Sequence, residues 1–390
     1  MRTKDTSTAF KETRFVFIAG APRSGTTLLG SLLDDHPNLL GFRTEHSTIE
    51  RFFQNQHRID SYARTDFINV RKEGQQTLLA NQDFLKQKQE AINAEYGKSI
   101  DLSHEFDTQT FKSSYVEYLE GKTIDLETML KALACAQTAA CSYSKQHFSK
   151  ETKYFIFKQP FYTELFAQKV AEKIPNARFI HILREPIARY TSAKTRRIKQ
   201  CELKKKRLGP INRMSYVTGH TAIDIATRRL AENNSQQLGQ ANYKTLHFEQ
   251  LVETPLKAVE SILTWLDLDS DRFQIRPTRQ GQSKEAGSVL TNSNKVESTT
   301  SNRLAKYHQI TGWNERKIHK FLLESYIEQK PTSALKLINA FLVPLPNSTV
   351  KNYLCQLSDL SRCIFPRSAR HLERFLDKAK AGNADLSGAT

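Results

Sequence analysis

Short apolar runs alternate with segments of helical periodicity along most of the chain. The run at 14–20 is followed by leucines at helical spacing, which stop at Pro37. Comparable runs at 153–161, 177–186 and 243–251 are each followed by another helical stretch. A strand followed by a helix is the repeating unit of a parallel sheet covered on both faces. This order therefore predicts an α/β protein with three layers, a central parallel sheet flanked by helices.

A long, polar and largely helical insertion separates the first two units, at about residues 46–150. Its clearest helix spans 125–148, where one stripe at helical spacing is expected to pack into a core: Leu126, Met129, Leu130, Leu133, Gln137, Ala140 and Cys141. The stretch 280–303 is rich in Ser, Asn, Gly and Gln, which predicts a mobile loop. We expect one domain at 1–310 that contains the insertion, then a helical C-terminal extension at 311–390 that ends in a disordered tail.

Composition narrows the class of protein. The 390 residues include 58 Lys and Arg against 41 Asp and Glu, a formal net charge of +17. The chain should therefore attract an anion: nucleic acid, a phosphorylated cosubstrate, an acidic acceptor or a membrane surface. Five cysteines match no metal-ligand spacing, which favours reduced thiols. No apolar signal region precedes the first strand, and no window is apolar for the ~20 residues of a membrane span. We expect a soluble cytoplasmic protein, or a soluble form from which an anchor was removed.

The first strand leads into a loop that resembles a nucleotide-phosphate loop without its lysine. Kinases and ATPases carry the pattern GxxxxGK[ST]. Gly20, Gly25 and Thr27 match this pattern, whereas Thr26 stands at the lysine position. The glycines allow consecutive N–H groups to turn toward one anion, and the helix that follows directs its positive end at the same place. This sequence therefore predicts a P-loop-type fold that binds phosphate without the usual grip on a magnesium triphosphate.

Other donors remain in the loop. Arg23 offers a guanidinium group, and the hydroxyls of Ser24, Thr26 and Thr27 can donate hydrogen bonds to phosphate oxygens. This set favours a donor molecule that places one phosphate on the loop and reacts without a metal ion.

The stretch PRSGTTLL resembles the 5′-phosphosulfate loop of sulfotransferases that use 3′-phosphoadenosine 5′-phosphosulfate (PAPS). Their second fingerprint, an arginine at a strand end and a serine in the next helix that reach the 3′-phosphate, is similar to FIHILREPIARYTSAKTRR. Here Arg184 ends the strand, and Ser192 and Arg196 follow in the helix. Residues four apart share a helix face, and the carboxyl edge of an open parallel sheet is where such sheets bind ligands.

Within this superfamily, the chain most resembles the tyrosylprotein sulfotransferases and their bacterial relatives. The resemblance covers about residues 14–45 and 153–310 and rests on PRSGTTLLGSLLDDHP, FKQPF, IPNARFIHILRE, HFEQLVETPLKAVESILTWLDL and SNKVESTTSNRLAKY. It implies sulfuryl transfer from PAPS to an acceptor hydroxyl, with adenosine 3′,5′-bisphosphate as the product and no metal.

The same resemblance implies catalytic roles. Glu45 is the candidate base, with Glu50 and His46 as alternatives because the match needs a one-residue gap. Lys158 corresponds to a lysine that contacts the sulfonate and the leaving oxygen, and Arg23 would assist it. Sulfuryl transfer needs such groups, because the acceptor must lose a proton and the leaving oxygen gains charge.

Further contacts to the nucleotide are implied. Lys295 and Ser298, in the predicted mobile loop, would cover the nucleotide. Phe248 stands where the family often has tyrosine and would line the adenosine pocket, although an aromatic residue at such a position is more often part of the core.

The densest basic run is RRIKQCELKKKR, at 196–207. It is either a solvated helix face or a rim that steers an acidic acceptor. The run contains no aromatic residue, whereas proteins that bind single-stranded nucleic acid interleave aromatic with basic residues. Nucleic acid is therefore not the expected partner.

One departure from the family concerns the acceptor. Members that modify tyrosine carry an arginine near the base, where this chain has His46 and Ser47, and their pair of cysteines beside these motifs is absent. Both differences favour an intracellular enzyme that acts on another hydroxyl, in a glycan, a lipid or a small molecule. Two alternatives remain: a P-loop kinase of small molecules, and a non-catalytic module that binds an anionic ligand.

Overall fold

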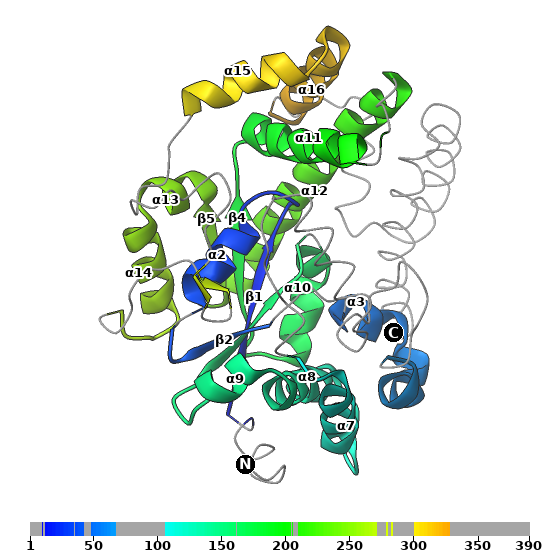
Figure 1. Cartoon of the computed structure of the whole chain (residues 1–390), viewed down its shortest axis with the longest axis vertical. Coiled ribbons are helices and arrows are strands. Elements are labelled where there is room, and N and C mark those ends of the chain that lie inside the picture. The colour runs from blue at the N-terminus through cyan, green and yellow to red at the C-terminus, as the bar shows by residue number, and fades with distance from the viewer. Residues whose placement is uncertain are drawn as a thin grey trace.

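The computed structural model describes residues 10, 12–34, 36–42, 48–67, 106–160, 162–203, 205, 210–270, 278–279, 282–283 and 300–327. Its centre is a five-stranded parallel sheet with the order β2-β3-β1-β4-β5 (Figure 1). The strands are β1 (Arg14–Gly20), β2 (Leu39–Gly41), β3 (Tyr154–Lys158), β4 (Arg178–Leu183) and β5 (Tyr243–His247). The structure thus confirms the predicted α/β class with a central parallel sheet flanked by helices.

Both faces of the sheet are buried, as the continuous apolar runs predict. Alternate residues of β1 point to opposite faces: Val16 and Ile18 join one core cluster, and Phe15 and Phe17 join another. The first cluster includes residues of α2 (Thr26–Leu33), α13 (Phe248–Glu253) and α14 (Pro255–Trp265). The second includes residues of α8 (Leu126–Ala140) and α10 (Tyr162–Lys173). These helices therefore form the two outer layers.

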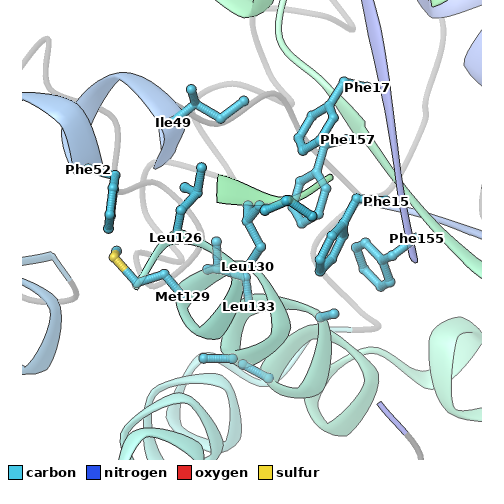
Figure 2. Packing of buried hydrophobic residues seen from close by; sticks show 14 of the residues in the cluster. Phe15, Phe17, Ile49, Phe52, Leu126, Met129, Leu130, Leu133, Phe155 and Phe157 are labelled. Atoms are coloured by element: carbon cyan, nitrogen blue, oxygen red, sulfur yellow. The ribbon is translucent and has the colours of Figure 1, made fainter. Parts of the chain in front are cut away.

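Helices of the predicted insertion close the second core. They include α3 (Thr48–Gln54), α4 (Ile59–Ser61), α7 (Thr108–Leu119) and α9 (Ser142–His147), with a 3₁₀ turn at Gln56–Arg58 and a π turn at Tyr62–Asp66. Figure 2 shows Leu130 and Leu133 of α8 beside the phenylalanines of β1 and β3. The whole predicted stripe of α8 is buried, which confirms that it packs into the core.

The insertion departs from expectation at Cys141. The sequence predicts one helix through 125–148, but Cys141 is extended, with φ −108° and ψ 122°, and pairs with Phe106 in an isolated antiparallel bridge. Helix α8 therefore ends at Ala140 and a separate α9 follows. Cys135, Cys141 and Cys201 are buried.

The remaining helices surround the carboxyl end of the sheet. They are α11 (Pro186–Leu203), α12 (Pro210–Asn242), α15 (Thr300–Ile310) and α16 (Trp313–Ile327), and Figure 1 shows α15 and α16 lying over α11 and α12. Helix α12 contains one non-helical residue, Gly239, at φ 69°.

The predicted mobile loop at 280–303 is corrected at its end. Helix α15 begins at Thr300, so the last residues of this stretch are helical, and the short strands β6 (Thr278–Arg279) and β7 (Gln282–Ser283) pair near its start. Residues 284–299 and 328–390 lie outside the described ranges, so the loop and the predicted tail stay predictions. No helix in the described part of the chain is long and apolar enough to cross a membrane.

Candidate active site

The loop between β1 and α2 is tightly turned. Gly20 and Gly25 have φ values of 140° and 109°, and Arg23 has φ 76°, which is uncommon for a residue with a side chain. A Cβ at Gly20 would lie 2.6 Å from Ser24 Oγ, and one at Gly25 would lie 2.3 Å from the ring of Phe248. The packing around the loop therefore demands glycine at both predicted positions. An unusual backbone of this kind is common in ligand-binding loops.

The predicted hydroxyl donors lie where the sequence places them. Gly25 precedes α2 as its N-cap, and Thr26 and Thr27 form the first turn of that helix. Ser24 is 1% exposed, and its Oγ has no hydrogen-bond partner among the described residues. A buried polar atom without a partner is rare and calls for an explanation, and an anion bound on the loop would supply one.

A lysine from the neighbouring strand reaches the loop. Lys158 ends β3, where it lies in register with Ile18 of β1. Its Nζ donates a hydrogen bond of 2.8 Å to Thr27 Oγ1. An ammonium group therefore stands beside the loop, although the loop itself has threonine in the lysine position.

The two predicted halves of the nucleotide site meet. Arg23 Nε donates to Ser192 Oγ at 3.3 Å, which joins the loop to α11. Arg184, directly after β4, donates through one terminal nitrogen to Arg23 O at 2.8 Å. Arg196 is exposed one turn after Ser192 on the same helix. The structure thus brings Arg23, Arg184 and Ser192 together, from three elements far apart in the sequence.

Phe248 belongs both to the core and to the edge of this site. It is 3% exposed, its ring lies against Gly25, and the guanidinium carbon of Arg184 lies 4.0 Å from the ring centroid. A cation over an aromatic face is an attractive arrangement that fixes the plane of the guanidinium group. Phe248 therefore supports both the loop and Arg184.

Tyr216 of α12 is a member of the site that the sequence did not reveal. Its Oη donates to Ala193 O at 2.8 Å, next to Ser192. Burial raises the pKa of Tyr216 to about 12, and the positive charges of nearby arginines act in the opposite direction: Arg197, Arg189, Arg23 and Arg196. These charges create a positive field on this side of the loop, which suits an anionic ligand.

Three further charged residues lie behind the site and were also missed. Arg189 of α11 is 1% exposed and forms an ion pair with Asp224 of α12, 2.9 Å from Nε to Oδ1. Arg228 pairs with the same carboxylate at 3.5 Å. The four-residue spacing of Asp224 and Arg228 on a helix is visible in the sequence, but no local pattern identifies Arg189 as their partner.

Several predicted residues lie outside the described ranges. They are Glu45, His46, Lys295 and Ser298, together with Lys204 and Lys206 of the basic run. Of the alternatives for the base, Glu50 is described: it lies in the first turn of α3 and is 6% exposed. Among the described residues, no group of three or more His, Cys, Asp or Glu is placed to hold a metal ion.

Comparison with known proteins identifies the family. The sequence model described as "Sulfotransferase family" matches residues 16–272, which include the loop, Lys158, Arg184 and Ser192. No significant match was found among curated proteins. The match confirms the resemblance to sulfotransferases that the motifs predict.

Several solved structures are similar to the chain. The sulfotransferase domain from the curacin biosynthetic pathway is 14% identical, with a TM-score of 0.41, over 89% of this chain and 98% of that one. The sulfotransferase domain of the Synechococcus PCC 7002 olefin synthase is 17% identical, with a TM-score of 0.35, over 86% and 97%. Retinol dehydratase in complex with androsterone and the inactive cofactor PAP is 12% identical, with a TM-score of 0.32, over 85% of each chain. Membership of the family rests on the sequence match rather than on these structural similarities.

Proposed function

The chain belongs to the sulfotransferase family, and we propose that it transfers the sulfuryl group of PAPS to an acceptor hydroxyl. The observation that carries the proposal is the contact between Arg23 Nε and Ser192 Oγ, at 3.3 Å. It unites the loop that would hold the 5′-phosphosulfate with the helix that would hold the 3′-phosphate. A donor that carries both groups would span this contact.

The residues at the loop fit one phosphate. The positive φ values of Gly20, Arg23 and Gly25 turn the loop backbone tightly, as in loops that gather N–H groups around an anion. Helix α2 begins directly after the loop, so its positive end faces the same place. The buried hydroxyl of Ser24 adds a donor. Arg184, Ser192 and Arg196 would bind the 3′-phosphate.

The reaction forms a bond between the acceptor oxygen and sulfur while the bond between sulfur and the bridging oxygen of the phosphate breaks. The electron pair of the broken bond stays on the departing bisphosphate. Lys158, beside Thr27, would stabilise the charge on that oxygen, and Arg23 would assist it. Glu45 would take the proton of the acceptor hydroxyl, with Glu50 or His46 as alternatives. Lys158 and Arg23 would supply the positive charge, so the proposed step needs no metal ion.

The proposed acceptor is a hydroxyl group carried by a glycan, a lipid, a small molecule or a tyrosine side chain. Within the basic run at 196–207, Arg196, Arg197, Lys199 and Lys205 are exposed. Such a surface suits either a solvated helix face or a rim that attracts an acidic acceptor. The second possibility supports an acceptor that already carries negative charge.

Calorimetry tests the proposal. Wild-type protein should bind adenosine 3′,5′-bisphosphate and should bind magnesium ATP far more weakly. Ser192→Ala should weaken bisphosphate binding about tenfold to a hundredfold, because a hydrogen bond to a charged group contributes about 1.5–3 kcal/mol. Thr195→Ala is the matched control on the same helix, since Thr195 Oγ1 donates to Thr191 O within α11.

The outcomes separate the alternatives. Preference for magnesium ATP would overturn the proposal in favour of a P-loop kinase. Tight bisphosphate binding without any sulfuryl transfer from PAPS to a broad panel of hydroxyl acceptors would favour a non-catalytic binder. For an enzyme that uses Glu45, the substitution Glu45→Gln should abolish transfer and leave bisphosphate binding unchanged.

A further inference from the structure

A buried cluster of charges lies directly behind the candidate nucleotide site. We call Arg189, Asp224 and Arg228 the arginine brace. Arg189 comes from α11, while Asp224 and Arg228 come from α12. The side chains of Arg189 and Asp224 are 1% and 4% exposed, and that of Arg228 is 18% exposed. The polar groups of Arg189 and Asp224 face each other and backbone carbonyls, so their role is exerted through other residues.

Each arginine of the brace holds a backbone carbonyl of the site. Arg189 donates to Pro22 O at 3.2 Å and to His220 O at 2.5 Å, while its Nε faces Asp224. Arg228 donates to Arg184 O. Pro22 O belongs to the peptide that joins Pro22 to Arg23, and Arg184 O belongs to the residue that directly follows β4. The brace therefore fixes one peptide plane beside each of the two arginines that form the site.

These contacts connect Asp224 with the loop backbone at Arg23 by two routes, one through Arg189 and one through Arg228 and Arg184. Asp224 pairs with Arg189 and Arg228, and Arg184 donates to Arg23 O at 2.8 Å. The loop backbone at Arg23 is thus held on both sides, through Pro22 O and through Arg23 O. Arg23 needs this support because its φ of 76° is unfavourable for a residue with a side chain and persists only where the surroundings enforce it.

The chemistry of the brace is better suited to fixing the position of the loop than to stabilising the fold alone. Replacement of a buried ion pair by apolar residues of similar volume is often neutral or stabilising. An arginine, however, presents several donors in a rigid plane and can hold several acceptors at once. Arg189 uses this property to connect α12 with the loop, because its donors reach the carboxylate and two separate backbone segments.

We propose that Asp224, acting through Arg189 and Arg228, is a positioning residue that sets the geometry of Arg23 and Arg184 for binding of the nucleotide. This inference rests on the proposed function, because the ligand is the bisphosphate part of PAPS. Asp224 and Arg189 do not touch the donor molecule; they determine where the side chains that touch it lie.

The test measures binding of adenosine 3′,5′-bisphosphate to full-length variants by calorimetry and thermal unfolding of the same samples. Asp224→Asn should weaken binding about tenfold to a hundredfold, since small displacements in a preorganised site have effects of this size. Arg228→Gln should give a smaller loss. If Asp224→Asn does not fold, Arg228→Gln carries the test, because it leaves the pair of Arg189 and Asp224 in place.

A double-mutant cycle separates positioning from general destabilisation. If Arg228 acts by placing Arg184, Arg228→Gln should weaken binding in the wild-type background and have no further effect on Arg184→Ala. Equal losses in the two backgrounds would overturn the proposal. Asn234→Ala is the matched control on α12, because the amide of Asn234 donates to Glu164 O at 2.8 Å and not to the loop. It should lower the unfolding temperature without weakening binding.

The experiment also distinguishes the two levels of inference. Wild-type protein that does not bind the bisphosphate would contradict the proposed function itself. If wild-type protein binds the bisphosphate and both Arg228→Gln and Asp224→Asn bind it as tightly as wild type, the role proposed for the brace is contradicted. The proposed function would then remain intact.

Discussion

Lys158 and Thr27 belong to different β–α units, yet their side chains lie 2.8 Å apart, from Nζ to Oγ1. The sequence predicts this meeting only in outline. Lys158 stands at the end of a strand, and parallel strands bring their carboxyl ends to one edge of the sheet. The position of the ammonium group beside the loop then follows from the direct pairing of β1 with β3.

Substitution of Lys158 should affect the chemical step more than binding. We expect Lys158→Met to lower kcat about a hundredfold or more, because the ammonium group would act on charge that develops only as the bond to sulfur breaks. Steady-state transfer from PAPS measures kcat, a single turnover isolates the rate constant of the chemical step, and calorimetry measures bisphosphate affinity. Lys153→Met, just before the other end of β3, is the control and should change neither. An equally large loss of bisphosphate affinity would show that Lys158 binds the ground state instead.

Single residues also mark where sequence reasoning stops. The proximity of Arg23, Arg184 and Ser192 could be predicted, because each belongs to a short motif that resembles a family pattern and has a chemically sensible spacing. Arg189 and Asp224 could not, because an arginine on a basic helix is usually a solvated surface residue. Their burial depends on the approach of α12 to α11, which is a tertiary contact without a local signal.

Whole elements were predicted where the apolar periodicity was one-sided. The sequence of α8 shows large apolar residues at helical spacing, and these pack into the core, although the smaller residues between Ala132 and Thr138 are buried as well. Helix α12, at Pro210–Asn242, was not identified from the sequence. It contacts α10, α11, α16 and two strands, so its buried residues face several directions and give no single stripe. Strand β2 has three residues, too few for a pattern of alternation.

Helix α16 carries a histidine that should make stability depend on pH. His319 is 2% exposed and lies 3.0 Å from Tyr307 Oη through its Nδ1. Burial, with a smaller effect of Arg189, lowers the pKa of His319 from 6.5 to about 4. The unfolded chain therefore binds this proton at a higher pH than the folded chain. Stability is fully present above pH 6.5 and is lost as the pH falls toward 4.

The size of this effect can be measured by denaturant unfolding between pH 7 and pH 4. The pKa difference corresponds to at most about 3 kcal/mol of unfolding free energy. His319→Gln should reduce the slope of stability against pH in this window, although it also lowers stability at pH 7. His57→Gln, which replaces an exposed histidine, should leave the slope unchanged. An identical slope in His319→Gln and wild type would show that other groups control the acid transition.

At the scale of the whole molecule, the candidate site lies where the order of strands in the sheet reverses. The chain runs outward from β1 to β2 on one side, returns to β3, and then crosses to β4 and β5 on the other side. Open parallel sheets bind ligands where the strand order reverses, beyond the carboxyl ends of the strands. The loop and Arg184 follow β1 and β4 at this edge, and Lys158 is the last residue of β3. The alternation of strands and helices predicts such an edge, but not the spatial order of the strands.

The net charge of +17 gives the last prediction at this scale. If the basic run steers an acidic acceptor, its charge should accelerate the encounter with that acceptor. Joint substitution of Lys204, Lys205 and Lys206 by Ala should then lower kcat/KM about threefold to tenfold at low ionic strength. Nucleotide affinity should stay unchanged. The difference should vanish in salt that screens charges beyond a few ångströms. Joint substitution of three exposed lysines elsewhere, Lys145, Lys150 and Lys257, changes the net charge equally and should have little effect. Equal losses in both triple variants would assign the attraction to the net charge, and unchanged kinetics in both would show that these lysines do not steer the acceptor.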